Sequence, residues 1–263
     1  MSTLKTAEAI KSLLLSISLL LIFVPLGLIS KSMAQADNTL AKPQFQTLHQ
    51  CVKKFEYDIH FFGKRVGYLH RTIDWSTKEN ANQAVVNSYG EVSFLWVDSS
   101  YQQTSVMQYS QTLNHFLTPS FTQKLTGIKS REMDAVISKD GLKSRVTLND
   151  EIHHYQSDQQ PLYDLDTLGA QIRLNLIKEK KSFTLLRQAS SKIKRYQFQV
   201  AGFEELQHEK WGKLKAIKVI EVGEYSETVL WFSIQHDYQL IKAELDMIFS
   251  PHVWLSSFSV QCN

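Results

Sequence analysis

The clearest pattern in the chain is an alternation of apolar and polar residues that begins at Val52. Every second position is then apolar: Phe55, Tyr57, Ile59 and Phe61. The positions between them are polar: Lys54, Glu56, Asp58 and His60. Because successive side chains of a strand point to opposite faces, this pattern predicts a strand with one buried face. Gly63 and Lys64 predict a turn into a second strand over residues 66–75.

Similar short segments follow, and turn residues separate them. Before the middle of the chain we expect strands over 84–97, 101–110, 121–128, 132–138 and 142–148. After it we expect strands over 182–187, 194–201, 214–222, 227–233, 240–249 and 254–261. Asp140-Gly141 is the strongest hairpin signal among the connections. Connections this short favour an antiparallel meander.

One segment has the period of a helix instead. After Pro161, either Asp164 or Asp166 is expected to cap a helix that runs to about Lys178. Its apolar residues recur at spacings of three and four: Leu165, Leu168, Ile172 and Leu176. We therefore predict a mostly β fold, in which a large curved antiparallel sheet, an open or half barrel, packs on one main helix near 164–178.

The start of the chain has the layout of a secretory signal peptide. Lys5 and Lys11 precede an apolar run over residues 13–29, and Ala34-Gln35-Ala36 offers a cleavage site. Cleavage near Ala36 would place the remainder in the periplasm of a bacterium. An uncleaved inner-membrane anchor is the alternative.

The domain organisation follows from this reading. We expect residues 1–36 to be a signal peptide, 37–50 a flexible tether containing Pro43, and 51–263 a single antiparallel β domain. The formal net charge is +3, and most of this excess lies in the predicted leader. The remainder is nearly neutral, so it lacks the basic footprint of a nucleic-acid-binding protein.

The two cysteines, Cys51 and Cys262, lie near the ends of the predicted domain. In an oxidising compartment such a pair predicts a disulfide, and two unpaired thiols are the alternative. The bond would close a loop over most of the chain, for which chain entropy gives about 5 kcal/mol as an upper bound. It requires the first and last strands to lie side by side.

The order of these elements resembles the bacterial secreted family that carries domain of unknown function 3108. The likeness rests on residues 55–59, 63–67, 164–168, 214–222, 228–232 and 240–245. It implies an envelope protein with a curved antiparallel sheet and brings no established catalytic residues. The shape is also similar, more loosely, to the open β-barrels of lipoprotein carriers, a likeness of fold that transfers no function.

Motifs for catalysis and metal binding are absent from the sequence. There is no H-E-x-x-H and no G-x-S-x-G, and two cysteines cannot build a zinc site of thiolates alone. His153 and His154 would point to opposite faces of a strand. Asp164 and Asp166 are expected to serve the helix start. We therefore predict no catalytic residues, no metal and no cofactor.

A run of cations after the helix has two interpretations. Its members are Lys178, Lys180, Lys181, Arg187, Lys192, Lys194 and Arg195. The run could bind anionic lipid head groups or another envelope component. The ordinary alternative is a solvated hairpin whose lysines discourage edge pairing.

Aromatic residues are the most suggestive feature for function. The chain holds 14 Phe, 10 Tyr and 5 Trp. Eight aromatic residues are candidates for an apolar ligand face: Phe55, Tyr57, Phe61, Phe94, Trp96, Trp231, Phe249 and Trp254. If the helix leaves that face open, a cavity for an acyl chain results. If the helix fills it, these residues form a core.

Together these features predict a non-catalytic periplasmic protein that binds or carries a hydrophobic ligand such as a lipid. The helix of Leu165–Leu168–Ile172–Leu176 would then be its lid or plug. A structural or protein-interaction component of the envelope is the second hypothesis, with an envelope protein as its partner. A hydrolase without a recognisable motif is the third. Neither the ligand nor the oligomeric state follows from the sequence.

Overall fold

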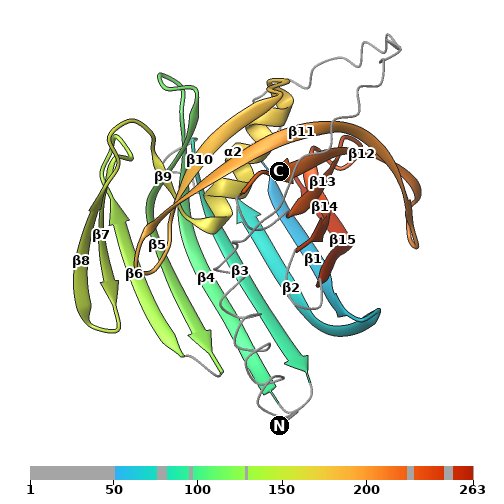
Figure 1. The fold of residues 1–263 in the computed structure, drawn as a ribbon, viewed down its shortest axis with the longest axis horizontal. Helices are drawn as coiled ribbons and strands as arrows, with labels where there is room; N and C mark the ends of the chain where they lie inside the picture. Colours follow the sequence, from blue (N-terminus) through green and yellow to red (C-terminus); the bar gives the residue numbers. More distant parts are fainter. Residues whose placement is uncertain are drawn as a thin grey trace.

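A computed structural model describes residues 51–75, 82–94, 97–127, 130–223, 228–245 and 251–262. The predicted fold class is confirmed: one large antiparallel sheet curves around the single helix of the described residues (Figure 1). The predicted leader and tether, together with Trp96 and Phe249, lie outside the described residues.

The sheet contains 15 strands. The first eight are β1 (Val52–Phe61), β2 (Lys64–Asp74), β3 (Gln83–Phe94), β4 (Val97–Ser110), β5 (His115–Thr126), β6 (Arg131–Ile137), β7 (Lys143–Leu148) and β8 (Glu151–Gln156). After β9 (Leu162–Tyr163) comes the helix, α2 (Leu165–Ile177). The remaining strands are β10 (Ser182–Gln188), β11 (Ile193–His208), β12 (Gly212–Glu221), β13 (Val229–Ser233), β14 (Gln239–Glu244) and β15 (His252–Gln261).

Sequential neighbours pair along most of the sheet, as in a meander. The spatial order runs from β8 down to β1, crosses to β15, and then runs down to β9. All these pairings are antiparallel except the short one between β9 and β10. The first and last strands therefore meet in the middle of the sheet, with Val52 opposite Gln261.

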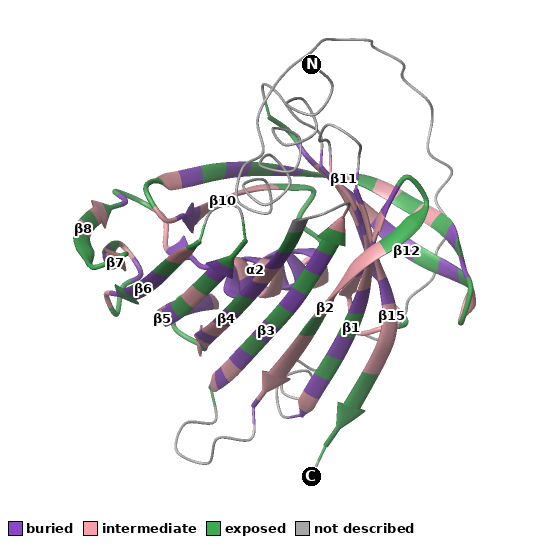
Figure 2. Cartoon of the chain, turned by 90° about the horizontal axis from the view of Figure 1, so that it is seen from below, coloured by how far each residue is buried: buried purple, intermediate pink, exposed green. Residues whose placement is uncertain are grey.

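Alternating burial shows why these residues form strands. In β1 the odd-numbered residues from Lys53 to Phe61 are buried, and in β3 buried and exposed residues also alternate (Figure 2). Turn residues end the strands where predicted. Phe62 and Gly63, between β1 and β2, both have positive φ, and such a pair matches the twist of a tight hairpin.

Several strands differ from the sequence prediction; β5, for example, begins at His115 instead of residue 121. β8 and β9 were not predicted, because β8 is mostly exposed and β9 has only two residues. β11 was predicted to end near Ala201 but continues to His208. A bulge between Val200 and Gly202, where the glycine has φ +110°, carries the strand past this point.

The helix prediction is confirmed, and Asp164 is the capping residue. Its side chain accepts hydrogen bonds from the backbone N–H groups of Asp166 and Thr167. Leu168, Ile172 and Leu176 of the predicted stripe are buried, and Leu174 is buried as well. Because the sheet curves around α2, residues outside the predicted apolar stripe are buried too, among them Gln171, Arg173 and Asn175.

The predicted disulfide joins Cys51 to Cys262. The two Cα atoms are 4.4 Å apart, immediately beyond the paired ends of β1 and β15. The bond therefore clamps the centre of the sheet, between its first and last strands.

The β9 edge of the sheet folds over and packs against β5, β6 and β7. Leu162 of β9 packs with Phe121, Met133 and Val146 from β5, β6 and β7. Ser144 of β7 donates a hydrogen bond to Gln188 of β10 over 2.6 Å. The sheet thus curls almost to a barrel, and side chains fill its seam.

Candidate functional site

A cavity of about 290 Å³ lies on the concave side of the sheet, against α2. Residues from β1 to β5, from β10 to β15 and from α2 line it, so strands from both halves of the sheet enclose it. Interiors and mouths of curved sheets are common ligand sites, and this volume is at the lower end of the range of roughly 300–1,000 Å³ for such pockets.

Apolar side chains make up most of the lining. They include Tyr57, Ile59, Leu69, Ile73, Trp75, Val92, Met107, Phe116, Leu125, Tyr196, Phe198, Leu230, Phe232, Leu240 and Val253. Their position follows from strand periodicity, because the curvature directs one face of each strand inward. An apolar ligand in this space would lose contact with water, which contributes about 25 cal/mol for each Å² buried.

The helix supplies one wall of the cavity. Leu165, Leu168 and Ile172 of the predicted helix stripe line it, whereas Leu176 packs in the core beneath. Gly169 also lines it, and a Cβ at this position would meet only the Arg71 guanidinium, at 3.8 Å. The glycine therefore leaves open space where most residues would fill the cavity.

Polar contacts hold α2 in its first turn, at its middle and in its second half. At its start, the Asp166 carboxylate pairs with Arg71 over 2.7 Å. At its middle, Gln171 accepts a hydrogen bond from the Phe116 backbone N–H over 2.9 Å. Two residues further on, Arg173 pairs with Asp237 over 2.6 Å. These tethers join the helix to β2, β5 and the turn after β13.

A buried polar network surrounds the two carboxyl groups at the helix start. The donors to Asp164 and Asp166 are Ser88, Gln103, Ser105 and Thr118, at 2.6–3.1 Å. Burial and the neighbouring Asp166 charge raise the pKa of Asp164. Burial alone would lower the pKa of Arg71, but the charges of Asp166, Tyr57, Tyr101 and Asp164 together outweigh it and raise the pKa. These hydrogen bonds hold the start of α2 in place, which is consistent with the predicted role of the two carboxyl groups.

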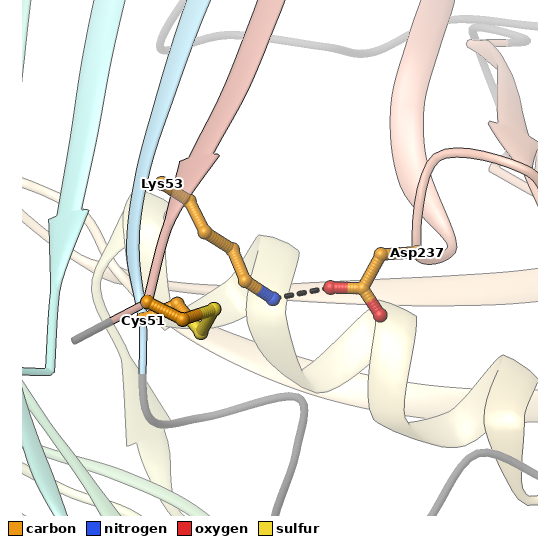
Figure 3. Close-up of a disulfide and its surroundings, with 4 residues drawn as sticks. Cys51, Lys53 and Asp237 are labelled. Carbon is orange, nitrogen blue, oxygen red and sulfur yellow. Dashed lines mark hydrogen bonds and ion pairs between the residues drawn. A yellow bond between two sulfur atoms is a disulfide. The ribbon is translucent and has the colours of Figure 1, made fainter.

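A second buried charge cluster consists of Lys53, Asp237 and Arg173. Asp237 lies in the turn between β13 and β14 and accepts hydrogen bonds from Arg173. It also accepts from Lys53 (Figure 3). Burial and the nearby Arg173 charge lower the pKa of Lys53 to about 8. Lys53 and Arg173 line the cavity, and their charges are balanced in part by this shared carboxylate.

A third cluster lies where β10 and β11 face β4 and β6. It contains Arg187, Lys194, Arg131 and Glu221, of which Arg187 and Glu221 line the cavity. Burial raises the pKa of Glu221 to about 7. Burial and the Arg187 charge lower the pKa of Lys194 to about 8, and the same two causes lower the pKa of Arg131.

Of the aromatic residues predicted to form a ligand face, Tyr57 lines the cavity. Phe55 and Trp231 belong instead to a separate core with Leu206 and Leu214, against which Trp254 packs. The strong curl from β12 to β1 brings the β11–β12 hairpin onto these residues and fills that part of the concave face.

Two further aromatic candidates lie at the other end of β1. Phe61 and Phe94 stack with ring centroids 5.3 Å apart in a small core with Val92. They therefore close one end of the sheet instead of lining the cavity.

Several cavity residues escaped the sequence interpretation. Tyr196 and Phe198 alternate with polar neighbours in β11, so the strand pattern alone could have assigned them to the inner face. Arg71, Arg187 and Glu221 gave no such signal. A buried charge and a surface charge look alike in a sequence, because burial depends on which strands face each other.

The structure contains a second, more polar hollow. A hollow of about 590 Å³ lies between the neighbouring ends of β4, β5 and β6, and residues such as Gln108, Ser110 and Lys139 give it a polar wall.

Within the described ranges, no group of three or more His, Cys, Asp or Glu residues could hold a metal ion. No helix in the described part of the chain is long and apolar enough to cross a membrane.

Fold and site together define a class: an almost closed antiparallel sheet that holds an apolar cavity beside a buried helix. No protein-family model matches the chain, and no curated protein matches it significantly. The resemblance to the family with domain of unknown function 3108 stays a prediction.

Proposed function

We propose that this chain is a non-catalytic binding or carrier protein for a hydrophobic ligand, such as a lipid, in the bacterial periplasm. The observation that supports this most directly is the apolar cavity of about 290 Å³. The secretory pattern of residues 1–36 and the Cys51–Cys262 bond fit an exported protein in an oxidising compartment.

The mechanism would be sequestration. The inner strand faces replace water around the ligand, and α2 forms one wall. Because α2 is tethered at Asp166 in its first turn and at Arg173 in its second half, it suits a plug better than a lid that swings open.

Gly169 offers a direct test of this proposal. Gly169→Phe places a ring in the open space beside Arg71. We expect it to weaken binding of the neutral fluorophore N-phenylnaphthylamine by at least about tenfold. The matched control, Gly169→Ala, adds only a methyl group and should bind the fluorophore like the wild type. Because alanine favours a helix more than glycine does, Gly169→Ala should raise the free energy of unfolding by up to about 1 kcal/mol.

Fluorescence titration and thermal unfolding measure the two effects. Equal binding by the folded Gly169→Phe and Gly169→Ala variants would rule out this cavity as the site. Native mass spectrometry of gently purified protein then identifies any lipid that remains bound. The same spectrum tests the predicted start of the exported chain at Asp37.

A structural or protein-interaction role is the second candidate, and β8 favours it. This strand has one neighbour within the described sheet, β7, so its outer edge could pair with a strand of a partner. Ile152 of β8 and Val136 of β6 are 52% and 60% exposed. Loss of a co-purifying envelope protein in an Ile152→Lys variant would support this role.

A further inference from the structure

One hydroxyl group of the cavity lining is buried without a hydrogen bond. Ser99 of β4 lines the cavity and is 6% exposed, and its Oγ has no hydrogen-bond partner among the described residues. A buried hydroxyl in this state costs free energy, because it has given up its bonds to water and received none in exchange. A polar atom of a ligand in the cavity would supply the missing partner.

The next two residues of β4 differ from Ser99 in this respect, although both of them also line the cavity. The Ser100 Oγ lies 2.7 Å from the Thr126 Oγ1, so these two hydroxyl groups bond to each other. The Tyr101 hydroxyl donates a hydrogen bond to the Gln103 side chain over 2.8 Å. The protein therefore satisfies the hydroxyl groups beside Ser99 and leaves that of Ser99 unpaired.

The two neighbours of Ser99 on the adjoining strands explain why its hydroxyl stays unpaired. Val92 is opposite Ser99 in β3, and its side chain has no hydrogen-bonding atom. On the other side lies Gly127, directly after β5, where an added Cβ would be 2.2 Å from the Ser99 Oγ. Gly127 has φ +115°, a conformation that favours glycine. Without a side chain there, the hydroxyl is neither covered nor bonded by that residue.

The charged side chains of the lining have opposite charges beside them within the protein. The combinations are Arg71 with Asp166, Lys53 and Arg173 with Asp237, and Arg187 with Glu221. A charged ligand group would need a counter-charge of its own in these apolar surroundings, whereas an uncharged polar group needs only a hydrogen bond. The lining therefore favours an uncharged head group at Ser99.

The shape of the cavity points to a ligand with one chain. Ser99 and Met107 both line it from β4, and at the usual rise of a strand they are about 25 Å apart. A volume of about 290 Å³ over such a length leaves room for something narrow. At the Met107 end the walls are apolar: Trp75, Phe116, Leu168 and Ile172.

Resting on the proposed function, we infer that the ligand is an uncharged amphiphile, a single apolar chain that ends in a hydroxyl, ester or amide group. The Ser99 hydroxyl donates a hydrogen bond to the oxygen of that group, and the chain extends towards Met107 and Phe116. The head group thus satisfies the unpaired hydroxyl, and the chain replaces water along the apolar walls.

Displacement of N-phenylnaphthylamine from the disulfide-bonded protein at pH 8 tests the inference. The competitors are 1-decanol, methyl decanoate, decanamide and the anion decanoate, which share one apolar chain and differ in the head group. We expect at least one uncharged competitor to bind at least about tenfold more tightly than decanoate. The tightest of the three identifies the head group. Decanoate binding as tightly as all of them overturns the inference while the proposed function stands.

Ser99→Ala removes the hydroxyl and keeps the rest of the wall. It should weaken binding of the preferred uncharged competitor by roughly threefold to tenfold, which is the loss of one neutral hydrogen bond. The matched control is Ser259→Ala, which removes an exposed hydroxyl on β15 and should bind every competitor like the wild type. Wild-type affinity of Ser99→Ala for the uncharged competitors overturns the inference.

Stability separates a ligand-binding hydroxyl from a structural one. Because the Ser99 Oγ has no bond within the protein to lose, Ser99→Ala should leave the urea midpoint of the ligand-free protein unchanged or raise it. A lower midpoint would show that the hydroxyl stabilises the fold, and it overturns the inference. If neither the fluorophore nor any competitor binds the wild type, the proposed function itself fails.

Discussion

Asp237 is the residue on which two buried cations depend. Lys53 and Arg173 come from β1 and α2, and their side chains are 4% and 6% exposed. The three residues are far apart in the sequence, yet they share one carboxylate at the turn between β13 and β14. Removing one partner of a buried charge cluster leaves the others uncompensated, and this is more costly than losing an exposed pair.

Asp237→Asn is therefore expected to lower the free energy of unfolding by about 3–5 kcal/mol. Urea denaturation measures this change. Asp58→Asn is the matched control, because Asp58 pairs with Arg65, which is 59% exposed. Its loss should change stability by no more than about 1 kcal/mol. Similar effects of the two substitutions would contradict the structural role of the buried cluster.

Glu221 makes stability depend on pH. Its pKa is raised from 4.5 to about 7 by burial, so the unfolded state loses this proton at lower pH than the folded state. The free energy of unfolding should consequently fall as the pH rises from about 4.5 to about 7, by on the order of 3 kcal/mol at most.

Glu221→Gln should flatten this part of the stability profile. Glu205→Gln, on the exposed face of β11, should leave the profile unchanged. Urea midpoints at several pH values test the difference. An identical slope in the wild type and Glu221→Gln would show that Glu221 does not titrate in this range.

At the scale of elements, α2 depends on its capping residue more than an ordinary surface helix does. Asp164 caps the helix and also accepts hydrogen bonds from Thr118, Ser105 and Gln103 in a buried network. Truncation removes the cap and leaves these donors without their acceptor inside the sheet.

Asp164→Ala is expected to destabilise the protein by about 2–4 kcal/mol, from the lost cap and the unpaired donors together. Asp158→Ala, in the exposed turn before β9, is the control and should be nearly neutral. Thermal unfolding followed by circular dichroism compares the two. A neutral Asp164→Ala would mean that the network does not hold the helix.

At the scale of the whole molecule, the disulfide closes a ring that contains nearly the entire described chain. Cys51 and Cys262 are 211 residues apart, and β1 and β15 pair next to them. Cross-linking residues this far apart restricts the unfolded chain strongly in the chain-entropy model. The bond also fixes the register at the centre of the sheet.

The double substitution of Cys51→Ser and Cys262→Ser should lower the free energy of unfolding by about 2–5 kcal/mol. Treatment with dithiothreitol should shift the urea midpoint of the wild type to that of the double variant. The same treatment should leave the double variant unchanged. A midpoint unaffected by either change would exclude a stabilising role for the bond.

Local patterns were sufficient for most of the fold. The alternation of Phe55, Tyr57 and Ile59 predicted β1, and the spacing of Leu168 and Ile172 predicted α2. The terminal cysteines predicted that the first and last strands pair. These features could be read from the chain because strand and helix periods depend on neighbouring residues alone.

The site was decided by tertiary structure. The curl of the sheet placed Phe55 and Trp231 in a filled core and left Tyr57, Met107 and Phe116 around the cavity. It also brought Arg187 of β10 and Glu221 of β12 to one wall. Strands far apart in the sequence decide which inward-facing residues line the cavity and which pack in a core. They also decide which charges are buried. That physical dependence on distant neighbours is why the fold was predicted, whereas only a few cavity residues, such as Tyr57 and Leu168, were predicted.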